Sequence, residues 1–117
     1  MIAKELSVYQ DTYKFVKMVT VAQKGYSKQF KYTLGAKTVD TALQLFEYIQ
    51  LANMFRENRR THLNGFIVKF ETVKTLLRLA DDFHLISLNQ RTEMFPVMEK
   101  IGRQITAWKN STERKNP

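Results

Sequence analysis

The sequence predicts an all-α fold, an antiparallel up-down-up-down four-helix bundle formed as a single domain by residues 1–117. Apolar residues recur at alternating three- and four-residue steps in four separate segments, which is the spacing of one helical face. The connections between these segments are short, and helices joined by short connections pack antiparallel. A chain of 117 residues with 44% hydrophobic residues is also long enough to bury one core.

The first helix is expected over residues 7–24. Ser7 and Gln10 have the spacing of a capping box, in which each side chain accepts a hydrogen bond from the backbone N–H of the other residue. Gly25 follows the last helical residue and suits the left-handed conformation that ends many helices. The buried face of this helix is predicted to consist of Val8, Thr12, Phe15, Val19 and Ala22.

The second helix is predicted over residues 30–56, after a basic and aromatic connection at residues 26–31. Its buried face comprises Leu34, Thr38, Thr41, Leu45, Tyr48 and Ala52. The polar residues 57–60 interrupt the apolar pattern and predict a turn. The third helix is predicted over residues 61–83. Its buried face comprises Leu63, Phe66, Phe70, Val73, Leu77 and Ala80.

The fourth helix is predicted over residues 88–110, because Ser87 and Gln90 repeat the capping-box spacing. Pro96 lacks a backbone donor and is expected to bend this helix. The polar tail at residues 111–117 is expected to fray. Aromatic residues and methionines, including Phe70, Phe83 and Trp108, are expected mostly at the buried seam. The buried face of the fourth helix is predicted to comprise Met94, Val97, Ile101, Ile105 and Trp108.

The composition favours binding over catalysis. Nineteen lysines and arginines against eleven acidic residues give a formal net charge of +8, which favours an anionic partner such as nucleic acid. The chain has no cysteine, only two histidines and four scattered glycines, so we expect no metal, no cofactor and no phosphate-cradling loop. No apolar run is long enough to span a bilayer and no signal core is visible, so we expect a cytoplasmic protein that does not bind membranes.

The candidate nucleic-acid-binding residues fall in three groups. One end of the bundle gathers most of the basic side chains, the opposite end carries an arginine pair in the turn at residues 57–60, and a basic strip beside Tyr13 follows the first helix. The first group comprises Lys24, Lys28, Lys31, Lys74, Arg78 and Arg91. The arginine pair is Arg59 and Arg60, and the strip on the first helix comprises Lys14 and Lys17.

Each group also has a simpler interpretation. The lysines are equally consistent with an ordinary solvated surface. The arginine pair is equally consistent with a solvated turn whose charge stabilises the C-terminus of the preceding helix. Tyr9 and Tyr13 are expected to pack against a neighbouring subunit rather than stack on bases. His62 and His84 are expected to be surface or capping residues.

Four stretches of the chain resemble a known family. They are residues 6–13 (LSVYQDTY), 30–35 (FKYTLG), 76–82 (LLRLADD, followed by LIS) and 101–109 (IGRQITAWK). Their order is similar to that of the accessory variability determinant (Avd) proteins of diversity-generating retroelements, and the likeness covers nearly the whole chain.

This resemblance implies a subunit of a homopentameric barrel with a basic surface. It also implies binding to structured RNA, possibly DNA or an RNA/DNA hybrid, and to the reverse transcriptase of the element, in support of mutagenic reverse transcription. The resemblance implies no catalytic site in the accessory subunit itself.

Two alternatives stay open. The first is a four-helix-bundle protein of the type encoded by intervening sequences in 23S rRNA genes. The Asn-Ile-Ala-Glu-Gly signature of that family is missing, and residues 41–47 read TALQLFE instead. The second alternative is a structural homo-oligomer without a nucleic-acid role.

Overall fold

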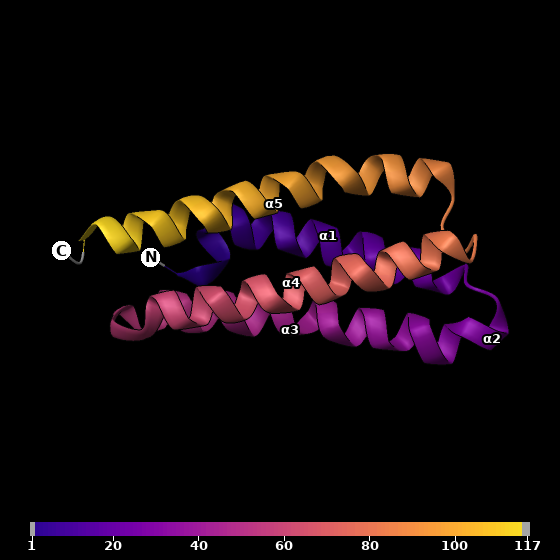
Figure 1. Ribbon diagram of the computed structural model, residues 1–117, viewed down its shortest axis with the longest axis horizontal. Helices are drawn as coiled ribbons and strands as arrows, with labels where there is room; N and C mark the ends of the chain where they lie inside the picture. The colour runs from indigo at the N-terminus through magenta and orange to yellow at the C-terminus, as the bar shows by residue number, and fades with distance from the viewer. Residues whose placement is uncertain (1, 116–117) are drawn as a thin grey trace.

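The computed structural model describes residues 2–115 and shows an elongated bundle of about 50 × 23 × 22 Å. The four long helices are α1 (Ser7–Lys24), α3 (Ala36–Met54), α4 (Arg59–Asp82) and α5 (Leu88–Lys115). The short elements are η1 (Ala3–Glu5), α2 (Lys28–Phe30), the π-helical turn η2 (Lys31–Gly35) and η3 (Arg56–Asn58). Successive long helices run in opposite directions (Figure 1), so the predicted up-down-up-down bundle is confirmed.

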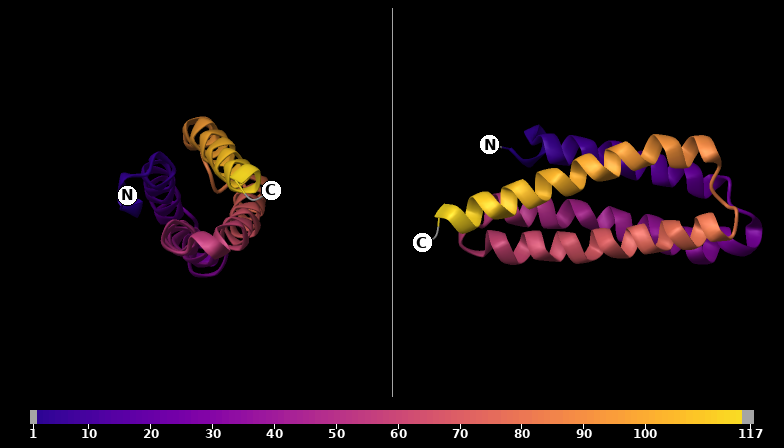
Figure 2. Two further views of the ribbon diagram at one scale, coloured as in Figure 1. Left: turned by 90° about the vertical axis from the view of Figure 1, so that its left-hand side faces the viewer. Right: turned by 45° about the horizontal axis from the view of Figure 1, so that its top comes forward.

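The four long helices form a ring around one seam. Helix α3 packs against α1 and α4, and α5 packs against the same two helices, so α1 lies diagonally opposite α4. The end-on view in Figure 2 shows this arrangement, with α5 inclined to the other three helices. The consequence for function is that the turns α1–α3 and α4–α5 meet at one end of the bundle.

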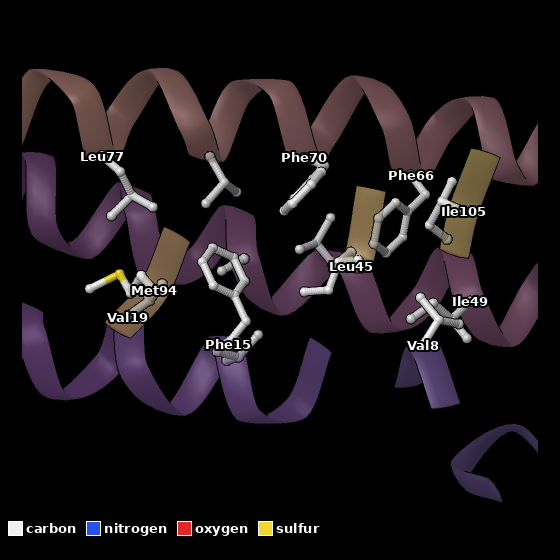
Figure 3. Packing of buried hydrophobic residues seen from close by; sticks show 14 of the residues in the cluster. Val8, Phe15, Val19, Leu45, Ile49, Phe66, Phe70, Leu77, Met94 and Ile105 are labelled. Atoms are coloured by element: carbon white, nitrogen blue, oxygen red, sulfur yellow. The ribbon is translucent and has the colours of Figure 1, made fainter. Parts of the chain in front are cut away.

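The predicted apolar faces form the core. Every residue of the predicted faces of α1 and α4 is buried, and Figure 3 shows Phe15, Leu45 and Phe66 converging on the seam from three helices. The Phe15 and Phe70 rings meet edge to face with their centroids 5.9 Å apart. Burying a side chain of this size contributes about 1.5–3 kcal/mol, so these aromatic contacts supply a large part of the driving force for folding. Four predicted face residues are only half-buried, namely Leu34, Tyr48, Val97 and Trp108.

The two predicted capping boxes have different outcomes. At α5, the Ser87 N–H donates to Gln90 Oε1 (3.0 Å) and the Gln90 N–H donates to Ser87 Oγ (3.1 Å), as predicted. At α1 the prediction is wrong, because η1 brings Leu6 into the cap position and Ser7 is already helical. The Gln10 N–H therefore donates to the backbone oxygen of Leu6 (3.1 Å).

The left-handed residue expected at Gly25 occurs instead at His84. Gly25 has φ −86° and stays right-handed, because the backbone N–H groups of Gly25 and Tyr26 bond back to Ala22 and Gln23 in a tight turn. His84 has φ 59°, and the next N–H, that of Leu85, donates to the Ala80 oxygen (2.9 Å). This bonding is that of a Schellman motif, which ends α4 sharply and redirects the chain into α5.

The second helical segment differs from the prediction at both of its ends. The second helical segment begins at Lys28 inside the predicted connection, passes through η2, and ends at Met54 rather than at residue 56. Gln23 Nε2 donates to the Lys31 oxygen (2.9 Å), which satisfies a carbonyl at the π-helical turn.

The last helix is longer than predicted. It continues to Lys115 instead of ending at residue 110, so the described part of the tail is helical rather than frayed; residues 116–117 lie outside the described range. The Thr112 hydroxyl donates to the Trp108 oxygen (3.1 Å) in the added turn. Pro96 lies inside α5 without ending it, and Figure 1 shows this helix as one arched ribbon.

Candidate nucleic-acid interface

Most of the candidate basic residues gather where α1 and α4 end and α5 begins, at the right-hand end of Figure 1. We call this region the lysine end and define it by Lys24, Lys28, Lys31, Arg78 and Arg91. Lys24, Lys28 and Arg78 are exposed and Lys31 is half-buried. Among the side chains of residues 2–112, the first four have no ion pair with an acidic side chain. Their charge is therefore available to an external anion.

Arg91 is partly neutralised by its own chain. Its Nη1 atom lies 2.6 Å from Asp81 Oδ2, so the pair links the first turn of α5 to the end of α4. Both side chains are partly exposed, and such a pair contributes between zero and about 1 kcal/mol. Asp82, the next residue, is exposed and offsets some of the positive charge nearby. We therefore expect the lysines and Arg78 to dominate the field at this end.

The basic strip of α1 borders a groove between α1 and α5. Lys14 and Lys17 are both exposed, and the Lys17 Nζ lies 5.8 Å from the centroid of the Tyr13 ring. The groove has a volume of about 400 Å³, and the apolar side chains of Met18 and Met94 contribute to its lining. The structure thus keeps Lys14 and Lys17 together, as predicted, on the α1 face that leads toward the lysine end.

The two tyrosines of α1 pack within their own chain. The ring centroids of Tyr9 and Tyr13 lie 5.2 and 6.2 Å from that of Phe46 on α3. Tyr9 is half-buried, whereas 55% of Tyr13 is exposed. Contact with a neighbouring subunit stays a prediction for the exposed part of Tyr13.

The arginine pair does not lie in a turn. Arg59 and Arg60 are the first residues of α4, which begins two residues earlier than predicted. Arg59 Nε donates to the Ala52 oxygen at 2.6 Å and Nη2 to the Asn53 oxygen at 3.4 Å. These acceptors belong to the last turn of α3, where backbone carbonyls lack helical partners. The structure favours the alternative in which this arginine stabilises the end of the preceding helix.

Arg59 also reaches α5. Its guanidinium carbon lies 5.5 Å from the centroid of the Trp108 ring, so one half-buried side chain connects α3, α4 and α5. Burial lowers the pKa of the Arg59 guanidinium, and the charge of Arg56 lowers it further. Arginine nevertheless stays protonated at neutral pH. Arg59 is therefore a structural residue, while Arg60 beside it is exposed.

Lys74 lies one helical turn before Arg78 on α4, but its charge is partly neutralised within its own chain. It forms an ion pair with Glu71 at 2.6 Å, and its Nζ lies 5.1 Å from the centroid of the Phe70 ring. These residues line a second groove, of about 820 Å³, between α4 and α5. The exposed ring of Phe95 lies on the α5 side of this groove. Lys74 thus lines a mixed apolar and charged groove and adjoins Arg78 at the edge of the lysine end.

An aromatic pair at the lysine end was missed by sequence reasoning. Phe83 was expected in the buried seam, but 52% of its surface is exposed and its ring stacks on that of Phe30 with centroids 4.9 Å apart. The helical periodicity of α4 ends one residue before Phe83, so the apolar pattern no longer specifies its direction. The histidines are not buried either: His84 is exposed, and the half-buried His62 lies 6.3 Å from Phe55 between ring centroids.

The described residues show neither a metal centre nor a membrane span. Among the side chains that the structure describes, no three histidine, aspartate or glutamate residues gather closely enough to hold a metal ion. None of the helices in this range combines the length and the apolar character needed to cross a bilayer. The surface features that bear on binding are the lysine end and the grooves that α5 forms with α1 and α4.

Comparison with known families matches a family model described as bAvd-like to residues 6–112. The chain belongs to the bAvd-like family. The match extends from the residue before α1 to residue 112 in α5, so it includes nearly all of the bundle and all three candidate groups. No curated protein and no solved structure matches the chain. Membership of this family confirms the predicted resemblance to Avd proteins. It also favours the Avd family over the intervening-sequence family.

Proposed function

We propose that this bAvd-like chain is a non-catalytic accessory protein of a diversity-generating retroelement, acting in the cytoplasm. In this role it binds structured RNA and the reverse transcriptase of the element, and so supports mutagenic reverse transcription. The observation that carries the RNA part is the lysine end, where Lys24, Lys28, Lys31 and Arg78 combine on a chain of net charge +8. Membership of the bAvd-like family supports the accessory role.

The chemistry of the lysine end suits phosphate groups rather than particular bases. Lysine ammonium groups are mobile point charges, and each phosphate that they neutralise releases condensed counterions. The strip formed by Lys14 and Lys17 on α1 extends this surface along the bundle. DNA and RNA/DNA hybrids present the same phosphates, so the proposal includes them as ligands. Recognition of one RNA in particular would then depend on its shape.

The partner surfaces are proposed from the apolar area that the bundle leaves uncovered. Phe95, in the groove between α4 and α5, and Val68, on the outside of α4, are 60% and 64% exposed. Exposed apolar side chains of this size are typical of protein contact surfaces when they form a patch. We propose that such surfaces join subunits into a homopentameric barrel and that the assembly presents its basic ends to the RNA. Polymerisation is assigned to the reverse transcriptase alone.

Charge variants test the RNA part directly. We compare the unchanged protein with a variant carrying Lys24→Ala, Lys28→Ala and Lys31→Ala. The matched control carries Lys4→Ala, Lys69→Ala and Lys109→Ala, which remove the same charge from η1, the middle of α4 and the last third of α5, outside the lysine end. The measurement is the dissociation constant for a structured RNA over a range of salt concentrations.

We expect the lysine-end variant to lose affinity and to flatten the plot of log K against log salt by about 0.9 per lost duplex phosphate contact. The control should keep the slope of the unchanged protein. Equal effects in both variants would show that only the overall net charge matters and would remove the lysine end from the proposal.

A structural homo-oligomer is the second candidate, and one observation favours it. Arg59, Lys74 and Arg91 all contact acceptors or acids of their own chain, so part of the basic composition is used within the fold. Light scattering with and without RNA separates the two candidates. An oligomer whose mass is unchanged by RNA at physiological salt would favour the structural role, and a salt-sensitive larger complex would support RNA binding.

A further inference from the structure

The aromatic pair at the lysine end has one covered and one open side. Phe30 is half-buried and packs against the core, and the Phe83 ring lies on it with an interplanar angle of 27°. Because Phe30 covers one face of Phe83, the 52% of Phe83 that is exposed includes the opposite side of its ring. The pair therefore presents a flat aromatic surface whose underside is anchored in the bundle.

Both rings are held by a defined backbone. The Phe83 N–H donates to the Leu79 oxygen (3.0 Å), and the Schellman motif at His84 fixes the chain directly after it. The Phe30 N–H donates to the Ser27 oxygen (2.9 Å) at the start of α2. The platform is thus formed before any ligand arrives, so binding does not require a flexible segment to become ordered.

The charged residues that flank the pair along the chain are mostly basic. Lys28 and Lys31 lie in the same helical segment as Phe30, and Arg78 lies five residues before Phe83 on α4. Asp81 is paired with Arg91, which leaves Asp82 as the acidic neighbour of Phe83 along the chain. An exposed aromatic face on segments that also carry cations suits a nucleotide with an unpaired base, because the base can stack while its phosphates meet the cations.

We propose that the open face of Phe83 is a stacking platform for an unpaired nucleotide base. Lys28, Lys31 and Arg78 then hold the flanking phosphates. This inference rests on the proposed function and adds a preference for single-stranded or looped RNA over duplex. In a duplex the bases already stack on one another, so the platform gains nothing from them.

The test replaces Phe83 by leucine in the full chain, which keeps apolar contact with Phe30 and removes the flat ring. The matched control is Phe55→Leu, because Phe55 is an exposed phenylalanine (43%) at the opposite end, also beside arginines. The probes are a short oligouridine and an RNA duplex of equal phosphate number. A second oligonucleotide carries the fluorescent base 2-aminopurine, whose emission is quenched when it stacks.

We expect Phe83→Leu to weaken oligouridine binding at least about fivefold, to leave duplex binding unchanged and to abolish the quenching. The salt slope should not change, because no charge is removed. Phe83→Tyr should retain both the affinity and the quenching. Circular dichroism of each variant checks that the bundle is intact.

Three results would overturn the platform. These are unchanged oligouridine binding in Phe83→Leu, an equal loss in Phe55→Leu, and an equal loss of duplex binding. Failure of the proposed function looks different, because the unchanged protein would then bind neither probe in a salt-dependent way.

Discussion

The buried hydroxyl of Thr12 tests how well the core satisfies its polar groups. Thr12 is completely buried on α1, and its Oγ1 is the only buried side-chain polar atom without a hydrogen-bond partner within the described residues. Thr38 is equally buried, but its hydroxyl donates to the Leu34 oxygen at 2.7 Å. A buried hydroxyl without a partner costs about 1–3 kcal/mol. Valine has the same shape without that cost, so Thr12→Val is expected to raise the free energy of unfolding by about 1–3 kcal/mol.

The assay is urea unfolding followed by far-UV circular dichroism, with every variant at one protein concentration because self-association would stabilise the folded state. Thr38→Val is the matched control. It removes a hydroxyl that donates to the Leu34 oxygen, so we expect the free energy of unfolding to fall by about 0.5–1.5 kcal/mol. Destabilisation by Thr12→Val that equals that of the control, at an unchanged denaturant slope, would refute the reasoning. The Thr12 hydroxyl would then be satisfied in solution.

Three further predictions concern packing, pH and the arginine of α4. Gly65→Ala should destabilise the fold by about 1–3 kcal/mol in chemical unfolding, because the new Cβ would lie 2.4 Å from the Tyr48 ring. Gly102→Ala, with open space at the same position, should instead stabilise it by up to about 1 kcal/mol; equal effects would contradict the close approach. Burial raises the pKa of Tyr26. The contribution of Tyr26 to the free energy of unfolding is therefore complete below the unfolded pKa of about 10 and is lost as pH rises through the folded pKa. Tyr26→Phe should flatten this alkaline decline and leave the free energy of unfolding at neutral pH unaffected. Arg59→Lys should lower the free energy of unfolding by about 1–2 kcal/mol without changing RNA affinity, and lost RNA binding at unchanged stability would return Arg59 to the interface.

The fold could be predicted because apolar spacing specifies which side of each helix is buried. Leu63, Phe66 and Phe70 follow the pattern, and all are buried. The spacing is read over several turns, so a single polar residue does not change the result. It does not specify where a helix begins, because that depends on one or two backbone hydrogen bonds. Ser87 caps its helix and Ser7 does not, although both carry the same sequence signal.

The candidate site was harder to predict because a charged residue has several uses that sequence does not separate. Arg59 and Arg78 are the same residue type on the same helix, but only Arg59 meets carbonyls of the preceding helix. Its partners Ala52 and Trp108 lie on two other helices, so only the packed structure brings them together. Phe83 was predicted to be buried but is exposed. It lies just beyond the end of α4, where helical periodicity no longer indicates which side of the chain faces the core.

Arginine and lysine have different roles in this protein, and the difference indicates which surface binds an external ligand. The arginine fork matches backbone carbonyls and carboxylates in fixed geometry, and Arg59 and Arg91 both use it within the chain. Lysine offers a mobile charge that costs more entropy to hold in one place, so unpaired lysines contribute little to the fold. The lysines of the lysine end therefore have no evident structural role. Replacing them should leave stability almost unchanged, and this separation of stability from binding makes the lysine end testable as a site.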